Sequence, residues 1–165
     1  MAKSEFNRES IVEEATSNQL TMVWTLVADA ILELELIAPG EIADLADKVD
    51  NYITEHPMHG SNLRAALLQA DQIMGKQYSQ PRMDPKAVRS AVELEAFKRK
   101  ARSVALHAAK CSICLGLNAT GQLSRNQLQR IFLLADISEG EIEAGHYQLK
   151  DVAQKIENAV ALTQV

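Results

Sequence analysis

A chain of 165 residues is long enough for one domain whose hydrophobic core needs no disulfide or metal to hold it together. Apolar residues make up 47% of the chain and charged residues 24%, which excludes a disordered polymer, and the net charge of −5 argues against a general nucleic-acid binder. The start of the chain is polar and its most apolar stretch, residues 20–38, carries three acids, so we expect neither a secretory signal nor a membrane span.

The seven glycines and four prolines fall in clusters that predict where the helices end. The clusters lie at residues 39–40, 57–60, 75–85, 116–121 and 140–145. The segments between them carry apolar residues at helical spacing, and no segment alternates with the period of two that a strand requires. The sequence therefore predicts an all-α fold, with about six helices in a compact bundle.

The first half of the chain is expected to hold three helices. Asn7 can cap the first, whose apolar stripe ends near Leu34, and Pro39 suits the first turn of the second. Ser61 is expected to cap the third helix, which runs to residue 74. Residues 75–85 form the one linker, so we expect a single domain, 1–165, made of two three-helix halves at 1–76 and 84–165.

The fourth helix is expected to open at Asp84 and Pro85 and to run to Leu115. The fifth helix begins at a capping box, in which Ser124 and Gln127 each satisfy a backbone N–H of the other.

A second capping box, Ser138 with Glu141, predicts a break at residues 135–137 and a sixth helix that begins directly after it. Gly140 and Gly145 would then lie inside that helix, and we expect a close helix contact there. The pair of helices over 124–146 would resemble a helix-turn-helix hairpin. Its second helix presents several acids that phosphates repel, so a plain helical hairpin is favoured over one that reads DNA.

The fourth helix carries a heptad seam of mostly small apolar residues, which lets a second helix approach closely. The seam consists of Leu94, Phe97, Ala101, Val104, Ala108, Cys111 and Leu115. The same helix carries a basic run of Lys98, Arg99, Lys100 and Arg102. Residues 1–56 hold three Lys and Arg against twelve Asp and Glu, so the basic run can dock on acidic helices of the same chain or of a second copy. It can also contact phosphates.

His107, Cys111 and Cys114 follow one another at helical positions i, i+4 and i+7. Zinc accepts both imidazole and thiolate ligands, so these residues are a candidate metal site. His107 and Cys114 would lie about 10 Å apart along a straight helix, so one ion is hard to reach from both residues unless the helix bends. A four-ligand site would also need a further residue, such as His56, His59 or His146, from elsewhere in the fold. The alternative interpretation, that the two thiols are core residues, is favoured because free cysteine is among the most buried residue types.

The favoured functional hypothesis is a non-enzymatic helical protein that binds another protein, including a second copy of itself, in assembly or regulation. A nucleic-acid-associated regulator using residues 86–115 or 124–146 is the first alternative, and a metal-binding helical protein is the second. No phosphate-binding loop or local nucleophile motif is present, so we expect no resident cofactor. An enzyme requires a pocket built from residues far apart in sequence. The expected location is the cytoplasm, because two cysteines without an export signal suit a reducing compartment.

Overall fold

A computed structural model of the chain describes residues 8–58, 60–75 and 91–163, and every regular element within these ranges is helical. The six helices are α1 (Arg8–Glu33), α2 (Ile42–Glu55), α3 (Leu63–Met74), α4 (Ala91–Ala119), α5 (Arg125–Glu143) and α6 (Leu149–Leu162). Single 3-10 turns, η2 (Pro39–Glu41) and η3 (Gly60–Asn62), precede α2 and α3. The predicted all-α fold of six helices is confirmed. None of the described helices is both long enough and apolar enough to cross a bilayer.

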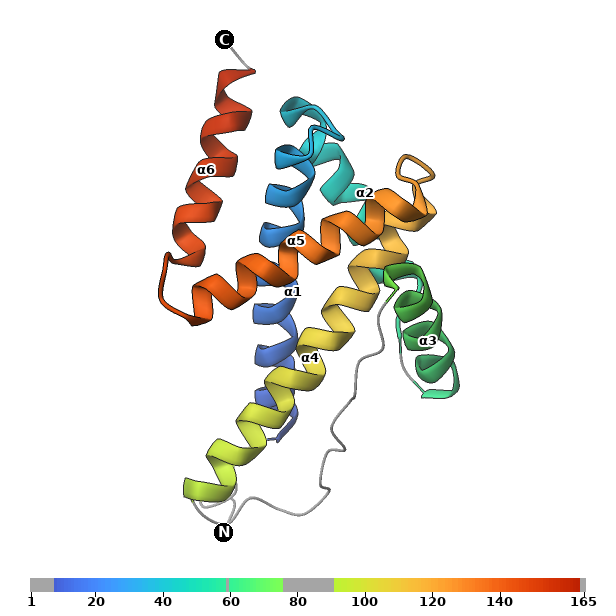
Figure 1. Cartoon of the computed structure of the whole chain (residues 1–165). Helices are drawn as coiled ribbons and strands as arrows, with labels where there is room; N and C mark the ends of the chain where they lie inside the picture. Colours follow the sequence, from blue (N-terminus) through green and yellow to red (C-terminus); the bar gives the residue numbers. More distant parts are fainter. Residues whose placement is uncertain (1–7, 59, 76–90, 164–165) are drawn as a thin grey trace.

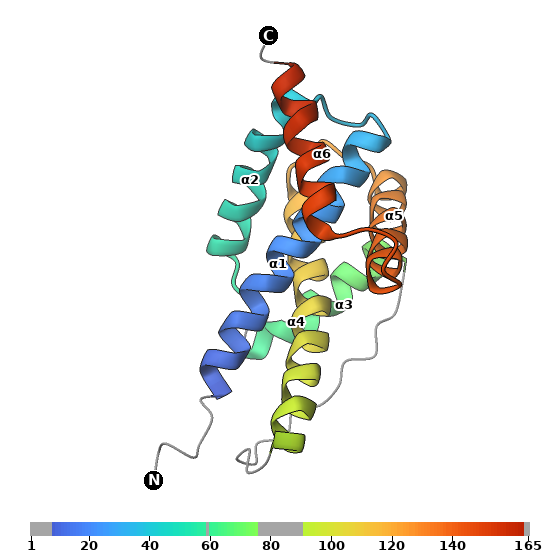
Figure 2. The same ribbon diagram turned by 90° about the vertical axis from the view of Figure 1, so that its left-hand side faces the viewer.

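The two longest helices, α1 and α4, form the most extensive helix contact in the structure (Figure 1). α5 crosses them and packs against both, and α6 lies on α1. α2 and α3 pack against α4. Figure 2 shows the same arrangement from the side, with the N-terminal turns of α1 and α4 projecting beyond the other helices.

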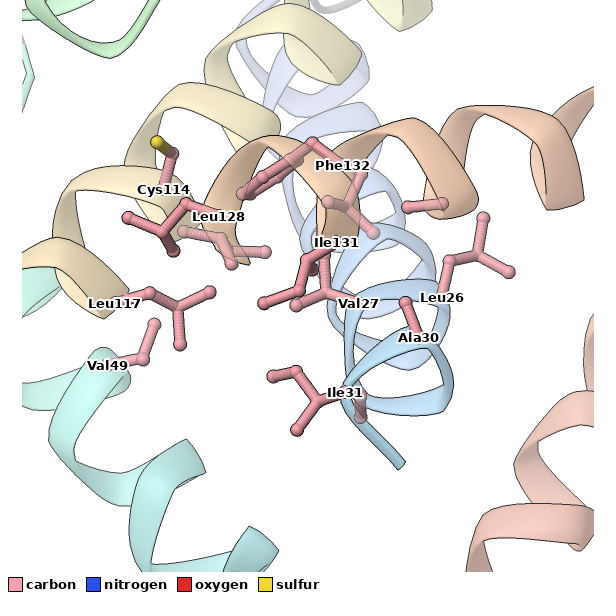
Figure 3. Packing of buried hydrophobic residues seen from close by; sticks show 14 of the residues in the cluster. Leu26, Val27, Ala30, Ile31, Val49, Cys114, Leu117, Leu128, Ile131 and Phe132 are labelled. Atoms are coloured by element: carbon pink, nitrogen blue, oxygen red, sulfur yellow. The ribbon is translucent and has the colours of Figure 1, made fainter. Parts of the chain in front are cut away.

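One hydrophobic cluster receives buried side chains from all six helices. Figure 3 shows its centre, with side chains from α1, α2, α4 and α5 labelled. Its largest fully buried members are Phe132, Ile31, Leu45, Ile113, Leu117, Leu128, Ile131, Val23 and Val27. The core is therefore aliphatic around one aromatic ring, as a chain with 4% aromatic residues requires. The predicted linker falls largely on residues outside the described ranges, and helices from both sides of it share this core.

The predicted break at residues 135–137 is wrong, because α5 continues from Arg125 to Glu143 without interruption. The chain turns out of the helix at Gly145, whose φ of 82° is the left-handed conformation that glycine adopts most easily. The N–H groups of Gly145 and His146 donate to the carbonyls of Ile142 and Glu141, each at 3.0 Å, which closes the helix in a Schellman motif. A Ser-x-x-Glu sequence also fits the interior of a helix, where the backbone N–H groups already have helical partners.

The hairpin predicted over residues 124–146 consequently does not form, and α6 begins only after Gln148. At its start, the N–H of Gln148 donates to Oδ2 of Asp151 at 2.9 Å. The region therefore contains one long helix and a separate terminal helix, with the turn ten residues later than the sequence indicated.

The helix contact expected at Gly140 and Gly145 occurs instead at Gly116. α4 extends to Ala119, so Gly116 lies inside it, and a Cβ added there would come within 3.0 Å of Cγ1 and 3.4 Å of the Cα of Val49 on α2. An added Cβ at Gly140 or Gly145 would meet nothing within 4 Å. Gly116 is thus the position at which a missing side chain lets two helix backbones approach.

The predicted helix starts have mixed outcomes. The box at Ser124 is confirmed, since Gln127 N–H donates to Ser124 Oγ at 3.2 Å and Ser124 N–H donates to Gln127 Oε1 at 2.8 Å. Pro39 opens the 3-10 turn that leads into α2, as expected. The prediction that Ser61 caps the third helix is wrong. α3 begins at Leu63, and the residue before it, Asn62, makes no capping hydrogen bond through its side chain. Asn7, Asp84 and Pro85 lie outside the described residues.

Candidate functional site

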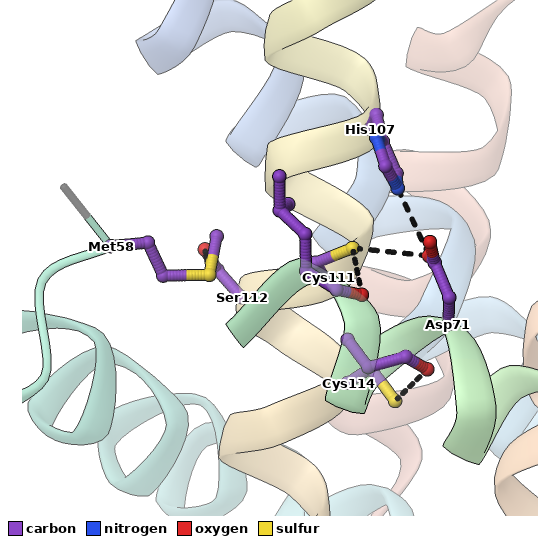
Figure 4. Close-up of polar contacts among 8 residues, drawn as sticks. Met58, Asp71, His107, Cys111, Ser112 and Cys114 are labelled. Atoms are coloured by element: carbon purple, nitrogen blue, oxygen red, sulfur yellow. Dashed lines mark hydrogen bonds and ion pairs between the residues drawn. The ribbon is translucent and has the colours of Figure 1, made fainter. Parts of the chain in front are cut away.

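A cluster of polar side chains lies between α3 and α4, in an otherwise apolar helix contact (Figure 4). Asp71 on α3 accepts a hydrogen bond on Oδ1 from Nε2 of His107 at 3.0 Å. The thiol of Cys111 donates to the same oxygen at 3.6 Å. His107 and Cys111 are one turn apart on α4, so both face α3, and the side chains of His107 and Asp71 are only 7% and 12% exposed.

Cys114, the third residue of the predicted metal site, does not join this cluster. Its thiol points to the backbone carbonyl of Ala70, with Sγ 4.0 Å from the oxygen. Sequence reasoning missed Asp71, which takes the third place. An available signal was its position on α3, beside Ala70 and one turn after Leu67, where an acid stands next to the buried stripe of the helix.

Both thiols are held in the protonated form. Burial, followed by the negative charge of Asp71, raises the pKa of Cys111 well above its ordinary value. The same two causes raise the pKa of Cys114 to about 12. Asp71 also stands between His107 and Cys111, whereas a catalytic triad places the imidazole between the thiol and the acid. The arrangement is therefore unsuited to nucleophilic catalysis.

A second polar cluster ties α4 to α5. Nζ of Lys110 lies 2.9 Å from Oδ1 of Asp136 and 3.0 Å from Oε2 of Glu139, and the lysine side chain is 8% exposed. Burial by itself lowers the pKa of Lys110, but the hydrogen bond to Asp136 and the two carboxylate charges outweigh it, so the pKa is raised. The two acids are three residues apart and share one face of α5 only because the helix is continuous there.

The heptad seam lies partly inside the chain. Ala101 and its neighbour Ala105 pack against Ala15 and Ile11 of α1 in a small second hydrophobic cluster. Phe97 is also buried. The remaining seam residues differ in burial. Leu94, Val104 and Ala108 are half-buried, whereas Cys111 and Leu115 are buried in the main core.

The basic run lies mostly on the surface. Arg99, Lys100 and Arg102 are exposed, and Lys98 is half-buried. Arg99 and Arg102 form one side of a cavity of about 340 Å³ that runs between α1, α4 and α5. The cavity is completed by Gln19, Met22, Ser103, Leu106, Glu139, Ile142 and Glu143. An acidic wall from α5 thus faces a basic wall from α4 across an apolar floor.

Comparisons of this chain with protein-family models, with curated proteins and with solved structures gave no match. The functional argument therefore depends on the contacts and charges described above.

Proposed function

We propose that the chain is a non-enzymatic assembly protein that pairs with a second copy of itself. The pairing surface is the arm, defined as residues 8–21 of α1 together with residues 91–106 of α4. The observation that carries this proposal is the projection of the N-terminal turns of both helices beyond the other helices, which is visible in two views (Figures 1 and 2).

The contact inside the arm is small. Ala15, Ala101 and Ala105 form its buried cluster and Ile11 packs against them, while Phe97 is buried nearby on α4. Valines remain on the outside, where Val12 is 41% and Val92 is 78% exposed. A pair of helices gains most of its stability from packing against further helices, and two such pairs side by side form a four-helix bundle. A second arm would supply those further helices.

Charge supports the choice of a second copy as the partner. Residues 9–21 contain three acids, Glu9, Glu13 and Glu14, and no base, whereas residues 98–102 contain four bases and no acid. Among the described residues, no ion pair involves any of these seven side chains. In a two-fold dimer the acidic α1 of each copy would face the basic run of the other, so every such contact occurs twice.

The test measures molar mass by light scattering during gel filtration at micromolar concentration. We expect twice the mass of the chain at low salt, and a shift toward the monomer when salt screens the charges. Reversing the four bases to glutamate should weaken the dimer. Combining that variant with a second chain that carries Glu9→Lys, Glu13→Lys and Glu14→Lys should give a heterodimer.

Lys150→Glu on α6 is the matched control, because it reverses an exposed lysine outside the arm. This variant should remain a dimer. A wild-type chain that stays monomeric, with a mass that salt does not alter, would contradict the proposal.

A nucleic-acid role for the basic run has weaker support. Arg99 and Arg102 share their cavity with Glu139 and Glu143, which would repel phosphates. The predicted helix-turn-helix hairpin is absent from the described residues. Binding of random duplex DNA at about 50 mM salt, lost on reversal of the four bases, would favour this alternative over the dimer.

A further inference from the structure

The cluster at the α3–α4 contact has the composition of a metal site. It offers one carboxylate oxygen, one imidazole nitrogen and one thiol sulfur, from Asp71, His107 and Cys111, and these three atoms all lie within 4.8 Å of one another. The groups come from two helices that already pack together, so the surrounding core fixes their positions (Figure 4). We propose that these residues bind a single zinc-class divalent cation that joins α3 to α4.

The two distances to the carboxylate oxygen of Asp71 are close to those of tetrahedral coordination. Zinc bonds of ~2.0–2.3 Å place neighbouring ligand atoms about 3.3–3.6 Å apart in a tetrahedron. The nitrogen of His107 is 3.0 Å and the sulfur of Cys111 is 3.6 Å from the carboxylate oxygen of Asp71. Shifts of a few tenths of an ångström at the carboxylate therefore open room for the ion, and the imidazole and thiol close on it by side-chain rotation.

The ligand set selects the kind of ion. A sulfur ligand disfavours magnesium and calcium, which prefer oxygen, while a carboxylate and an imidazole disfavour copper(I), which prefers sulfur. Mixed nitrogen, sulfur and oxygen coordination suits zinc. On binding, the thiol of Cys111 loses its proton to solvent and its sulfur forms the metal bond. Nε2 of His107 gives up the proton that it donates to Asp71, so that the neutral imidazole carries its one proton on Nδ1 and binds the ion through Nε2.

Cys114 is the residue best placed to complete the four-coordinate site. It stands one turn after Cys111 on α4, and its thiol lies 4.0 Å from the Ala70 carbonyl oxygen. A rotation about its Cα–Cβ bond, away from that carbonyl, is required for the sulfur to reach the ion. Closed four-ligand sites are structural, and this one is buried, so its effect is to hold the two helices together.

The test uses the full chain, purified without a histidine tag and stripped with a chelator, and titrated with Co²⁺ as a coloured substitute for zinc. We expect saturation at one ion per chain, with the visible bands of tetrahedral cobalt and a thiolate-to-cobalt charge-transfer band. Zn²⁺ should displace the cobalt and raise the melting temperature of the wild-type chain. Cys111→Ala should lose the charge-transfer band, and Asp71→Asn should bind at least tenfold more weakly.

His56→Gln is the matched control, since His56 is an exposed histidine at the end of α2. It should bind like the wild type. Cys114→Ala tests the fourth ligand, and an unchanged affinity and spectrum would remove Cys114 from the site. A wild-type chain that shows no saturable binding, and no change of melting temperature with Zn²⁺, would overturn the proposal without depending on how any variant folds.

Discussion

The two ends of α4 lie in very different surroundings. At its C-terminal end, side chains from α1, α2, α3 and α5 enclose it, and even a lysine, a histidine and a glycine are buried there. Toward its N-terminal end, α4 packs against α1 through a small cluster made mainly of alanines, and its arginines share a cavity with α1 and α5. The comparison teaches that one continuous helix can serve two purposes, with stability concentrated at one end and a charged surface offered at the other.

Removing the largest core side chain should separate the two ends most clearly. Phe132 is 0% exposed, so Phe132→Ala should lower the free energy of unfolding by about 3–5 kcal/mol through lost burial and a new cavity. Val92→Ala in the arm should change it by less than about 0.5 kcal/mol, because Val92 is 78% exposed. Urea unfolding followed by circular dichroism measures both. Similar losses in the two variants would show that the arm belongs to the stable core.

Two lysines on α4 provide a second comparison. Lys110→Met should lower the free energy of unfolding by about 2–3 kcal/mol, because it leaves the partly buried carboxylates of Asp136 and Glu139 without their cation. Lys98→Met should have an effect of at most about 0.5 kcal/mol, since Lys98 lies in the arm. The same unfolding measurement applies. A near-zero cost for Lys110→Met would mean that the two acids reach water when the lysine is removed.

Two helical glycines distinguish a close helix contact from an open surface. Gly116→Val should destabilise the chain by about 1–3 kcal/mol, because its side chain would collide with Val49 on α2. Gly140→Ala should stabilise it by up to about 1 kcal/mol, because the position is helical and has open space around it. Thermal unfolding of the two variants should therefore shift in opposite directions. A stabilising Gly116→Val would show that α2 moves readily away from α4.

Alkaline pH should weaken the C-terminal end of α4. Both buried thiols have a higher pKa in the folded chain than the ordinary cysteine pKa of 9.0. Their contribution to the free energy of unfolding is therefore fully present below pH 9.0 and is lost as the pH rises above it. One pH unit above that value, each thiol should lower the free energy of unfolding by about 1 kcal/mol, because the thiols ionise freely only in the unfolded chain. Unfolding of the metal-free chain, measured with a chelator between pH 8 and 10, tests this.

Replacing Cys111 and Cys114 by alanine should flatten that pH profile, whereas Lys100→Met in the arm should leave it unchanged. A profile that stays equally steep in the double alanine variant would assign the alkaline loss to other groups. Deprotonation of Lys110 adds to the loss of stability only at higher pH, because its pKa is raised above the ordinary value of 10.5.

The sequence by itself determined the all-α fold, the number of helices and several of their ends. Glycine, proline and the box at Ser124 act through backbone angles and hydrogen bonds within a few residues, so their effects are readable locally. His107 and Cys111 were also identified correctly as neighbours on one helical face. The same local rules misplaced the start of α6, because Ser138 and Glu141 match a capping box and a helix interior equally well.

Only the tertiary structure decided which residues meet across helices. The contact of Gly116 with Val49, the pairing of Lys110 with two acids of α5, and the entry of Asp71 between His107 and Cys111 all join residues far apart in the chain. Helical periodicity fixes the face on which a side chain lies. The crossing of packed helices, which depends on the shape of the whole core, fixes what that face touches.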